Sequence, residues 1–376
     1  MTKIKMNIKP LDQWGVVQDL PLIISGPCSA ETKEQVMATA KALVEKTPQV
    51  RVFRAGAWKP RTRPNSFEGI GNEALGWMQE VKAETGLLTS VEVANANHVY
   101  EALKHGIDIL WVGARTTVNP FSVQEIANAL KGVDIPVMVK NPINPDLQLW
   151  LGAIERIHQA GITRLGAIHR GFSSGQNGRF RNAPQWKLPI ELKRLVPDLP
   201  MICDPSHICG NRDMLLEISQ KALDLAMDGL MLESHPNPDE AWSDQLQQVT
   251  PVALAGILED LNLRKPEGED REPVDFLKLY RDEIDLIDLE ILDTMSRRAK
   301  VIEKIAEYKK EHKMTILQVS RWDELLKDRL SLAKKLGLDP KFSKELYQQI
   351  HLMSIRIQTK VMNVDEEEID LDLPQK

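Results

Sequence analysis

The chain has 376 residues, of which 42% are hydrophobic and 27% charged, and its formal net charge is −6. This composition is typical of a folded globular protein and excludes disordered and fibrous classes, while the negative charge argues against nucleic acid or an anionic membrane as the main partner. Three cysteines do not form a disulfide framework, and we find neither a signal peptide nor a run of about 18 apolar residues. We expect a cytoplasmic protein with reduced thiols and with neither nucleic acid nor a membrane as a partner.

Short apolar runs alternate with amphipathic stretches of helical length from Pro21 to Leu263. We predict strands at Leu22–Ser25, Val50–Arg54, Leu87–Val93, Ile107–Val112, Pro136–Lys140, Arg164–Ile168, Leu199–Cys203 and Gly229–Leu232. Each is followed by a stretch with the 3.6-residue period of a helix, such as Lys33–Lys46. Eight β/α units in about 240 residues predict an α/β fold, a closed (β/α)₈ TIM barrel over residues 1–263. An open doubly wound sheet is the alternative, but no GxGxxG motif follows the first run.

The chain changes character after residue 263. Residues 264–273 contain no apolar side chain, which predicts a solvated linker. Three helical stretches follow, at Val274–Lys313, Val319–Leu336 and Lys341–Asn363, and residues 364–376 form an acidic tail. The first helix would be roughly 60 Å long, which is too long to fold back into a compact monomer. We therefore predict that residues 274–363 form a three-helix all-α domain that dimerises.

Cations gather at the predicted strand ends of the barrel. In this fold the active site is built from the C-terminal ends of the strands and the loops that follow them. Five basic residues from four different strands occupy such positions: Arg54, Lys59, Arg115, Lys140 and Arg170. One basic residue there would mean little, but five directed at one mouth require anionic groups between them. Their number suits phosphate and carboxylate groups.

A second set of residues at the same mouth could bind a metal ion. The run Gly229–Leu232 leads directly into Glu233, and a Pro-rich loop then delivers Asp244. Together with Cys28 and His207 these residues offer sulfur, nitrogen and oxygen ligands, a mixed set that can hold Mn²⁺, Fe²⁺, Zn²⁺ or a similar divalent ion.

Other interpretations of single residues remain open. Asp244, followed three places later by Gln247, is also a good helix N-cap. Cys28 taken alone is more often a buried structural thiol, and Cys209 competes with it as a ligand. His235, close to Glu233, is expected to support the site.

Several motifs together resemble one enzyme family. They are Gly26-Pro-Cys28-Ser, Lys59-Pro-Arg-Thr62, Gly113-Ala-Arg115, His169-Arg-Gly171 and Asp204-Pro-Ser-His207. Over about residues 20–263 the chain resembles the type I-beta 3-deoxy-D-arabino-heptulosonate 7-phosphate (DAHP) synthases. The resemblance implies the metal ligands Cys28, His207, Glu233 and Asp244. It also implies a phosphoenolpyruvate site at Arg54, Lys59, Arg115, Lys140 and Arg170, with Asp204 in the substrate site, and an erythrose 4-phosphate site at Arg61 and Thr62.

The octulosonate phosphate synthases are the close alternative. Their loop resembles Lys-Ala-Asn-Arg, whereas this chain has Lys59-Pro-Arg-Thr62. Asn141 and Pro142 stand where the heptulosonate family often has Arg-Gly. The resemblance implies that phosphoenolpyruvate condenses with erythrose 4-phosphate, with Lys59 protonating the forming alkoxide and Glu92 acting near C2 of phosphoenolpyruvate.

The first helix after the linker has one apolar stripe that also carries two cations. The stripe runs through Leu277, Tyr280, Ile284, Ile287, Ile291, Thr294, Arg298, Ile302, Ile305 and Lys309, at spacings of three and four, and we expect it to be buried. A buried Arg298 and Lys309 on one face require an anion. In the third helix Ser354 and Gln358 share a face with apolar residues, where structural hydrogen bonding explains them nearly as well.

This helical stretch resembles the all-helical (AroQ-class) chorismate mutases from Arg281 to Gln358. The resemblance implies that Arg298 and the Arg281 of a partner chain bind the two carboxylates of chorismate. Lys309 and Gln358 would donate to its ether oxygen, and Arg321 and Ser354 would complete the pocket. Two positions depart from the family: Gln318 stands where Asp is common, and Trp322 where Glu is common.

The two resemblances predict a bifunctional enzyme of aromatic amino-acid biosynthesis, a synthase and a mutase. The alternative is a synthase whose helical domain only dimerises and senses a ligand; a plain phosphate-sugar isomerase barrel explains neither the metal set nor the helices. We also expect prephenate or chorismate, bound between the helices, to inhibit the barrel.

Overall fold

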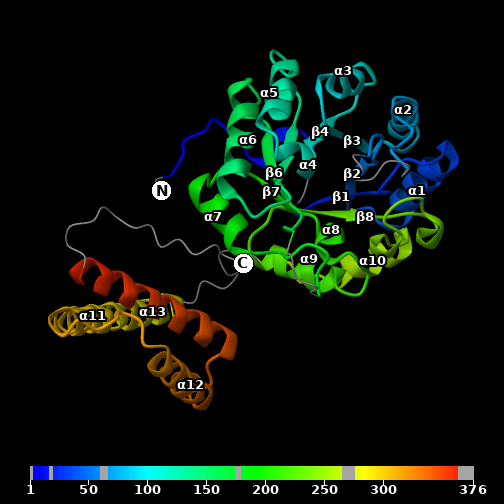
Figure 1. Cartoon of the computed structure of the whole chain (residues 1–376). Helices are drawn as coiled ribbons and strands as arrows, with labels where there is room; N and C mark the ends of the chain where they lie inside the picture. The colour runs from blue at the N-terminus through cyan, green and yellow to red at the C-terminus, as the bar shows by residue number, and fades with distance from the viewer. Residues whose placement is uncertain (1–2, 17–19, 60–66, 174–178, 265–275, 363–376) are drawn as a thin grey trace. The chain divides into compact units, whose positions relative to one another are not determined.

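The computed structural model describes residues 3–16, 20–59, 67–173, 179–264 and 276–362. It divides into two compact units, residues 1–269 and 270–376 (Figure 1). The predicted linker after Arg264 and the predicted acidic tail lie outside the described residues.

The first unit is a closed barrel of eight parallel strands that pair in chain order (Figure 1). The strands are β1 Leu22–Gly26, β2 Val50–Arg54, β3 Leu88–Val93, β4 Ile109–Val112, β5 Val137–Lys140, β6 Leu165–His169, β7 Met201–Cys203 and β8 Gly229–Glu233. Pairing of β1 with β8, for example Ser25 with Leu232, closes the barrel. The predicted α/β fold is confirmed, and the open sheet is excluded.

Helices lie outside the strands, as the amphipathic stretches predicted. They are α1 Lys33–Lys46, α2 Glu73–Thr85, α3 Ala96–Lys104, α4 Ala114–Thr117, α5 Pro120–Ala129, α6 Leu147–Gln159, α7 Lys187–Leu195, α8 Pro205–Cys209, α9 Leu215–Asp224 and α10 Pro251–Glu259. Side chains cap several of them: Thr32 accepts a hydrogen bond from the backbone of Gln35, and Asp146 accepts one from that of Leu149. The two shortest, α4 and α8, directly follow strands and therefore lie at the mouth of the barrel.

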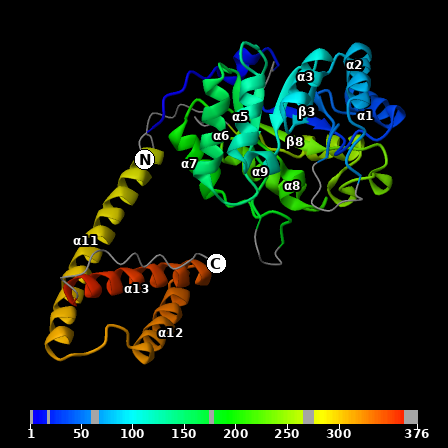
Figure 2. The ribbon, with the colours of Figure 1, turned by 45° about the horizontal axis from the view of Figure 1, so that its top comes forward.

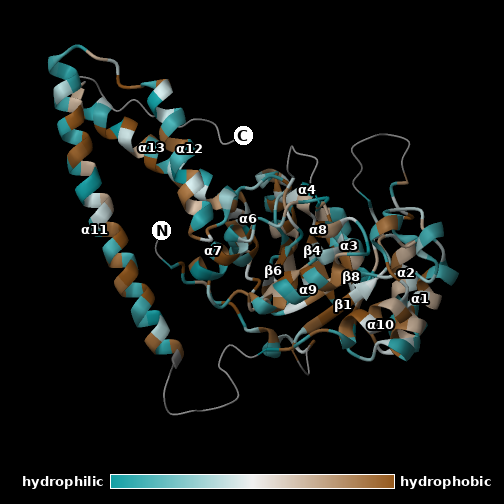
Figure 3. Ribbon diagram, turned by 90° about the horizontal axis from the view of Figure 1, so that it is seen from below, coloured by the Kyte–Doolittle hydropathy of each residue, from teal (hydrophilic) through white to brown (hydrophobic). Residues whose placement is uncertain are grey.

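The second unit contains three helices, α11 Phe276–Glu311, α12 Val319–Lys335 and α13 Pro340–Met362. Helix α13 crosses the C-terminal part of α11, and the N-terminal part of α11 extends beyond it (Figure 2). Figure 3 shows apolar residues along α11, and Ile284 and Ile291 on its N-terminal half are 56% and 54% exposed. Within one helical unit the stripe is therefore only partly covered, and its full burial stays a prediction for the dimer. Of the described helices, none combines the length and apolar character needed to cross a membrane.

The barrel interior is closed at its N-terminal end by a segment that precedes the first strand. A short 3₁₀ helix, Leu11–Trp14, places Leu11 and Trp14 against the inward-facing side chains of the strands, including Ile24 and Met231. Trp14 is 2% exposed, and its Nε1 donates to the carbonyl oxygen of Lys9 at 2.9 Å. A Cβ built on Gly166 would lie 3.0 Å from the Trp14 ring, so glycine at this position of β6 makes room for the indole. Sequence analysis assigned no role to this segment.

Replacing Trp14 with alanine should destabilise the barrel by about 3 kcal/mol or more, because the loss of a buried aromatic ring leaves a cavity. The matched control is Phe121→Ala, because the Phe121 side chain is 87% exposed and should change stability by less than about 0.5 kcal/mol. Urea unfolding of the full chain, followed by far-ultraviolet circular dichroism, measures both. Equal midpoints for the two variants would contradict the assigned role of Trp14.

Candidate functional site

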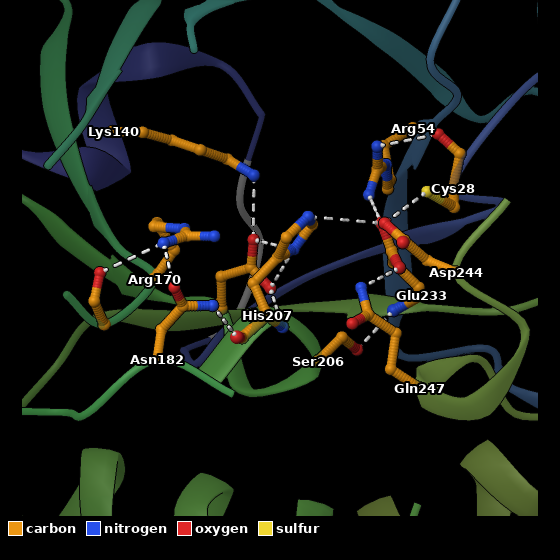
Figure 4. A network of polar contacts seen from close by, with 12 residues as sticks. Cys28, Arg54, Lys140, Arg170, Asn182, Ser206, His207, Glu233, Asp244 and Gln247 are labelled. Carbon is orange, nitrogen blue, oxygen red and sulfur yellow. Dashed lines mark hydrogen bonds and ion pairs between the residues drawn. The ribbon is translucent and has the colours of Figure 1, made fainter. Parts of the chain in front are cut away.

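Three of the four predicted metal ligands come together at the mouth of the barrel (Figure 4). Ligand atoms of Cys28, Glu233 and Asp244 all lie within 4.8 Å of one another. The Sγ of Cys28 is 3.3 Å from Oδ2 of Asp244. His207 lies beside them, with its Nε2 3.8 Å from Oε1 of Glu233. Cys28 and Glu233 are fully buried, so the set is shielded from bulk water.

Asp204 orients the imidazole of His207. Nδ1 of His207 is 3.0 Å from Oδ1 and 2.8 Å from Oδ2 of Asp204, and Nζ of Lys140 is 2.8 Å from Oδ2. Burial lowers the pKa of His207, which favours a neutral ring with its proton on Nδ1 and the lone pair of Nε2 facing Glu233. Burial alone would raise the pKa of Asp204, but its interactions with His207 and Lys140, which both donate to the carboxylate, hold that pKa well below its ordinary value. The described partners of the Asp204 carboxylate, His207 and Lys140, both belong to the proposed site.

Two cations, Arg54 and Lys59, contact the buried ligands Glu233 and Cys28. Nη1 of Arg54 is 2.6 Å from Oε1 of Glu233, and Nζ of Lys59 donates at 2.9 Å to both the sulfur and the carbonyl oxygen of Cys28. Arg54 is 2% exposed, and its Nε has no hydrogen-bond partner within the described part of the chain. A buried guanidinium with an unused donor is suited to an anionic ligand.

The chemistry of the donor set fits a divalent cation. Burial, with Glu233 acting in the same direction, raises the pKa of the Cys28 thiol to about 12, and a bound cation would instead favour the thiolate. A thiol, two carboxylates and an imidazole are ligands for a borderline ion rather than for Ca²⁺ or Mg²⁺, which prefer oxygen alone. The residues present therefore fit the predicted divalent metal.

The loop that carries Asp244 adopts an unusual backbone. Asp244 has φ +47°, in the left-handed region that few residues other than glycine adopt. It precedes the 3₁₀ helix Gln245–Gln247, but its side chain makes no capping hydrogen bond. The capping interpretation of Asp244 is wrong, because the carboxylate turns toward Cys28 and toward Arg181, whose Nη1 is 3.2 Å from Oδ1.

The remaining predicted anion-binding residues lie on the other side of the mouth. The Trp111 ring in β4 lies close to two cations, with its centroid 5.1 Å from Cζ of Arg54 and 5.7 Å from Nζ of Lys140. Burial lowers the pKa of Arg170 to about 10, opposed by Asp204 and reinforced by Arg181 and Arg115.

Two predicted residues of this side differ in their surroundings. Glu92 is partly buried and accepts a hydrogen bond from Nε1 of Trp111 at 3.1 Å, whereas Arg115 on α4 is exposed. A Cβ on Gly113 would lie 2.1 Å from Oε1 of Glu92, so a larger residue there would displace the Glu92 carboxylate from its present position. Arg61 and Thr62, the predicted erythrose 4-phosphate residues, lie outside the described residues.

Sequence analysis missed the neutral side chains that hold the ligands. Oγ of Ser206 accepts a hydrogen bond from the backbone of Glu233 at 2.9 Å, and Nε2 of Gln247 donates to Oε2 of the same residue at 2.7 Å (Figure 4). Oε1 of Gln248 accepts from the backbone of Cys28 at 2.9 Å. Polar residues in loops give no periodic signal, and the only hint was the position of Gln247 three places after Asp244.

His235 supports the same loop, as expected. Its Nδ1 accepts a hydrogen bond from the backbone of Asn237 at 3.0 Å, and its Nε2 lies 3.4 Å from the buried carboxylate of Glu31. Glu31 in turn accepts from the backbone of Trp242 at 2.7 Å. This pair therefore fixes the backbone at Asn237 and at Trp242, two residues before Asp244.

The helical unit contains a second polar cluster. Nη1 of Arg298 donates to Oγ of Ser354 at 2.7 Å, and Nζ of Lys309 donates to the carbonyl oxygen of Ile316 at 2.6 Å. Ser354, Gln358 and Lys309 are at most 8% exposed. Oε1 of Gln358 has no partner among the described residues. Buried polar groups of this kind can serve a polar ligand between α11 and α13.

Other predicted residues of this unit lie at its surface. Arg281 and Gln318 are exposed, and Arg321, also exposed, pairs with Glu324 at 2.9 Å. The indole of Trp322 stacks on the ring of His351, with centroids 3.9 Å apart. Within one chain these residues do not join the cluster around Arg298 through any described contact.

Both parts of the chain match known families. Residues 10–264 match the DAHP synthetase I family, and residues 280–359 match the chorismate mutase type II family. The chain is 31% identical over 227 residues to a phospho-2-dehydro-3-deoxyheptonate aldolase of Thermotoga maritima, an alignment that covers 60% of this chain and 64% of that relative. It is 26% identical to a 2-dehydro-3-deoxyphosphooctonate aldolase of Paraburkholderia xenovorans, over 64% of this chain and 88% of that one.

A solved structure agrees with the first of these similarities. The crystal structure of the Thermotoga maritima DAHP synthase is similar with a TM-score of 0.58 and 29% sequence identity, over 64% of this chain and 67% of that chain. A truncated form of that enzyme gives a TM-score of 0.55 and 26% identity, over 64% of this chain and 84% of that one. The chain therefore belongs to the DAHP synthetase I family and carries, after the barrel, a segment of the chorismate mutase type II family.

Proposed function

We propose that the chain is a bifunctional enzyme: its barrel condenses phosphoenolpyruvate with erythrose 4-phosphate to DAHP and phosphate, and its helical unit rearranges chorismate to prephenate. The observation that carries the first activity is the buried convergence of Cys28, Glu233 and Asp244 beside Arg54 and Lys59. This convergence supports a divalent-cation site beside a guanidinium with an unused donor, as a phosphorylated substrate requires.

In the condensation, C3 of phosphoenolpyruvate forms a bond to the aldehyde carbon of erythrose 4-phosphate, water adds at C2, and inorganic phosphate leaves. Arg54, Lys140 and Arg170, with Arg115 at the rim, hold the phosphate and carboxylate of phosphoenolpyruvate. A divalent ion held by Cys28, His207, Glu233 and Asp244, such as Mn²⁺, would supply Lewis acidity toward the aldehyde oxygen.

Proton transfer in this scheme falls to side chains that face the same mouth. Lys59, whose Nζ lies beside the Cys28 sulfur, donates a proton to the oxygen that was the aldehyde. Glu92 lies at the end of β3 and acts near C2, where water adds. Arg61 and Thr62 hold the phosphate of the aldehyde substrate.

The choice of erythrose 4-phosphate over arabinose 5-phosphate rests on the sequence of the Lys59-Pro-Arg-Thr62 loop and on the higher identity to the heptonate aldolase. The product assay with phosphoenolpyruvate and each sugar in turn tests it. A preference for arabinose 5-phosphate would make the barrel an octulosonate phosphate synthase.

For the helical unit, the mutase proposal rests on the half-buried Arg298 together with the buried Lys309, Ser354 and Gln358. Such a site accelerates a pericyclic rearrangement by holding one conformation of a dicarboxylate and stabilising its developing charge. The exposed apolar half of α11 supports a homodimer, in which the partner's Arg281 completes the pocket, with Gln318 and Arg321 at its edge. We place this enzyme in the cytoplasm.

A ligand-sensing role without catalysis is the second candidate for this unit. The stack of Trp322 on His351 favours it, because an indole has no acceptor for the substrate hydroxyl at a position where the chorismate mutases commonly have Glu. The two reactions are not consecutive in aromatic biosynthesis, so feedback explains the fusion better than channelling. We propose that prephenate or chorismate bound to the helical unit inhibits the barrel.

Metal removal should abolish the synthase reaction. Dialysis against a chelator is expected to lower phosphoenolpyruvate consumption by at least about 100-fold, and Mn²⁺ should restore it. The Cys28→Ser variant should need a higher Mn²⁺ concentration than wild type to reach the same rate. The Cys209→Ser variant should need the same concentration as wild type, because it alters a buried thiol outside the ligand set. Undiminished activity after chelation, or a larger effect of the Cys209 variant, would contradict the metal assignment.

Arg298→Ala should lower chorismate consumption on the order of 100-fold, because a positioned charge stabilises the transition state. Arg297→Ala is the matched control, since Arg297 is exposed and pairs with Asp293 on the same helix. Equal rates for wild type and Arg298→Ala, measured by loss of chorismate absorbance, would leave the sensing role as the function of the helical unit.

Feedback should depend on the same side chain. Prephenate is expected to inhibit phosphoenolpyruvate consumption by the wild type and by Arg297→Ala, but only weakly by Arg298→Ala, because that variant loses a ligand for the carboxylates. Inhibition curves for the three full-length proteins provide the comparison. If Arg298→Ala is inhibited like wild type, the effector does not act through this cluster.

A further inference from the structure

Two consecutive residues, Arg181 and Asn182, lie beside the proposed metal ligands without belonging to them. They lie between β6 and α7, and their backbone nitrogens donate to the carbonyl oxygens of Cys209 and Ile208 at 3.3 and 3.2 Å. This pairing holds the dipeptide against the segment that begins at His207.

Asn182 connects the anion side of the mouth to the metal side. Its Oδ1 accepts a hydrogen bond from Nη1 of Arg170 at 2.7 Å, and its Nδ2 donates to the carbonyl oxygen of His207 at 2.6 Å (Figure 4). Asn182 is 8% exposed, and both ends of its amide are used. A shift of Arg170 therefore changes a contact that also fixes the backbone of His207.

Arg181 reaches the other two parts of the ligand set. Its Nη1 is 3.2 Å from Oδ1 of Asp244 and donates to Oε1 of Gln247 at 2.5 Å. Gln247 is 1% exposed and connects Arg181 to Glu233, because its Nε2 donates to Oε2 of Glu233 at 2.7 Å. Space for this arrangement depends on Gly210, where a Cβ would lie 2.4 Å from Cβ of Arg181.

We infer that Arg181, Asn182 and Gln247 are positioning residues that hold His207, Asp244 and Glu233 in the geometry of the metal site and tie that geometry to Arg170. The inference rests on the proposed function of the barrel. None of the three needs to touch the ion or a substrate. An amide suits the position of Gln247, because it accepts from Arg181 and donates to Glu233 at once without adding charge between them.

Outer hydrogen bonds of this kind set metal affinity, and their loss weakens binding roughly 10- to 100-fold. Co²⁺ is the probe, because a Co²⁺-thiolate bond to Cys28 gives a charge-transfer absorption that reports binding without turnover. Gln247→Met keeps the length of the side chain and removes both of its hydrogen bonds. It should weaken Co²⁺ binding to the full chain about tenfold and leave the KM for phosphoenolpyruvate at saturating metal unchanged.

The matched control is Gln245→Met, in the same 3₁₀ helix, because Gln245 is exposed and its side chain bonds only the carbonyl oxygen of Ala241 among described partners. Its Co²⁺ affinity should equal that of wild type. If Gln247→Met does not fold, Gln247→Glu replaces it: this variant keeps the acceptor for Arg181 but presents a carboxylate to Glu233, and it should also weaken Co²⁺ binding.

Asn182→Ala tests the connection between His207 and Arg170. This variant should weaken Co²⁺ binding and also raise the KM for phosphoenolpyruvate, whereas Gln247→Met should weaken only Co²⁺ binding. Co²⁺ binding equal to wild type in both variants would overturn the inference and leave the proposed reaction intact. Absence of the thiolate band in the wild-type protein would instead overturn the metal site of the proposed function itself.

Discussion

The ion pair between Arg54 and Glu233 is the contact on which the barrel site depends. Both side chains are at most 2% exposed, and their charged atoms are 2.6 Å apart. A buried carboxylate without such a partner would be strongly destabilising. Lys140 and Asp204 form a second buried ion pair across the mouth at 2.8 Å, and the charged groups of Arg54 and Lys140 lie 5.1 and 5.7 Å from the Trp111 ring centroid. The parallel barrel makes this compensation possible, because it brings eight strand ends to one place.

Neutral side chains then determine where the charged groups point. Amides of Gln247, Gln248 and Asn182 join loops that are far apart in the chain, and each has partners at both ends. The polar site of the helical unit is built differently. Its polar cluster around Arg298 lies within a helix interface, while half of the apolar face of α11 stays uncovered in the single chain. The barrel site is thus assembled by one chain, and the helical site is proposed to need two.

Periodicity predicted the architecture closely. All eight strands lie where apolar runs precede amphipathic stretches, with β3 to β7 each starting one or two residues later than expected. The type I-beta assignment and the domain boundaries stay predictions. The alternative in which Asp244 caps a helix is wrong, because its carboxylate turns to Cys28. Burial of the whole α11 stripe, which one chain covers only in part, stays a prediction for the dimer. The segment that ends at Trp14 carries too short a pattern to reveal that it closes the barrel.

The sequence by itself determined the strand order, the charged and metal-binding residue types at the strand ends, and the helical character of the second unit. These follow from local spacing, because each strand places its last side chain at the mouth. Only the tertiary structure decided which of these groups touch: that Asp204 holds His207, that Lys59 lies on Cys28, and that Arg181 reaches Glu233 through Gln247. These contacts join residues up to 66 positions apart through loops, and loop conformation has no periodic signal in the sequence.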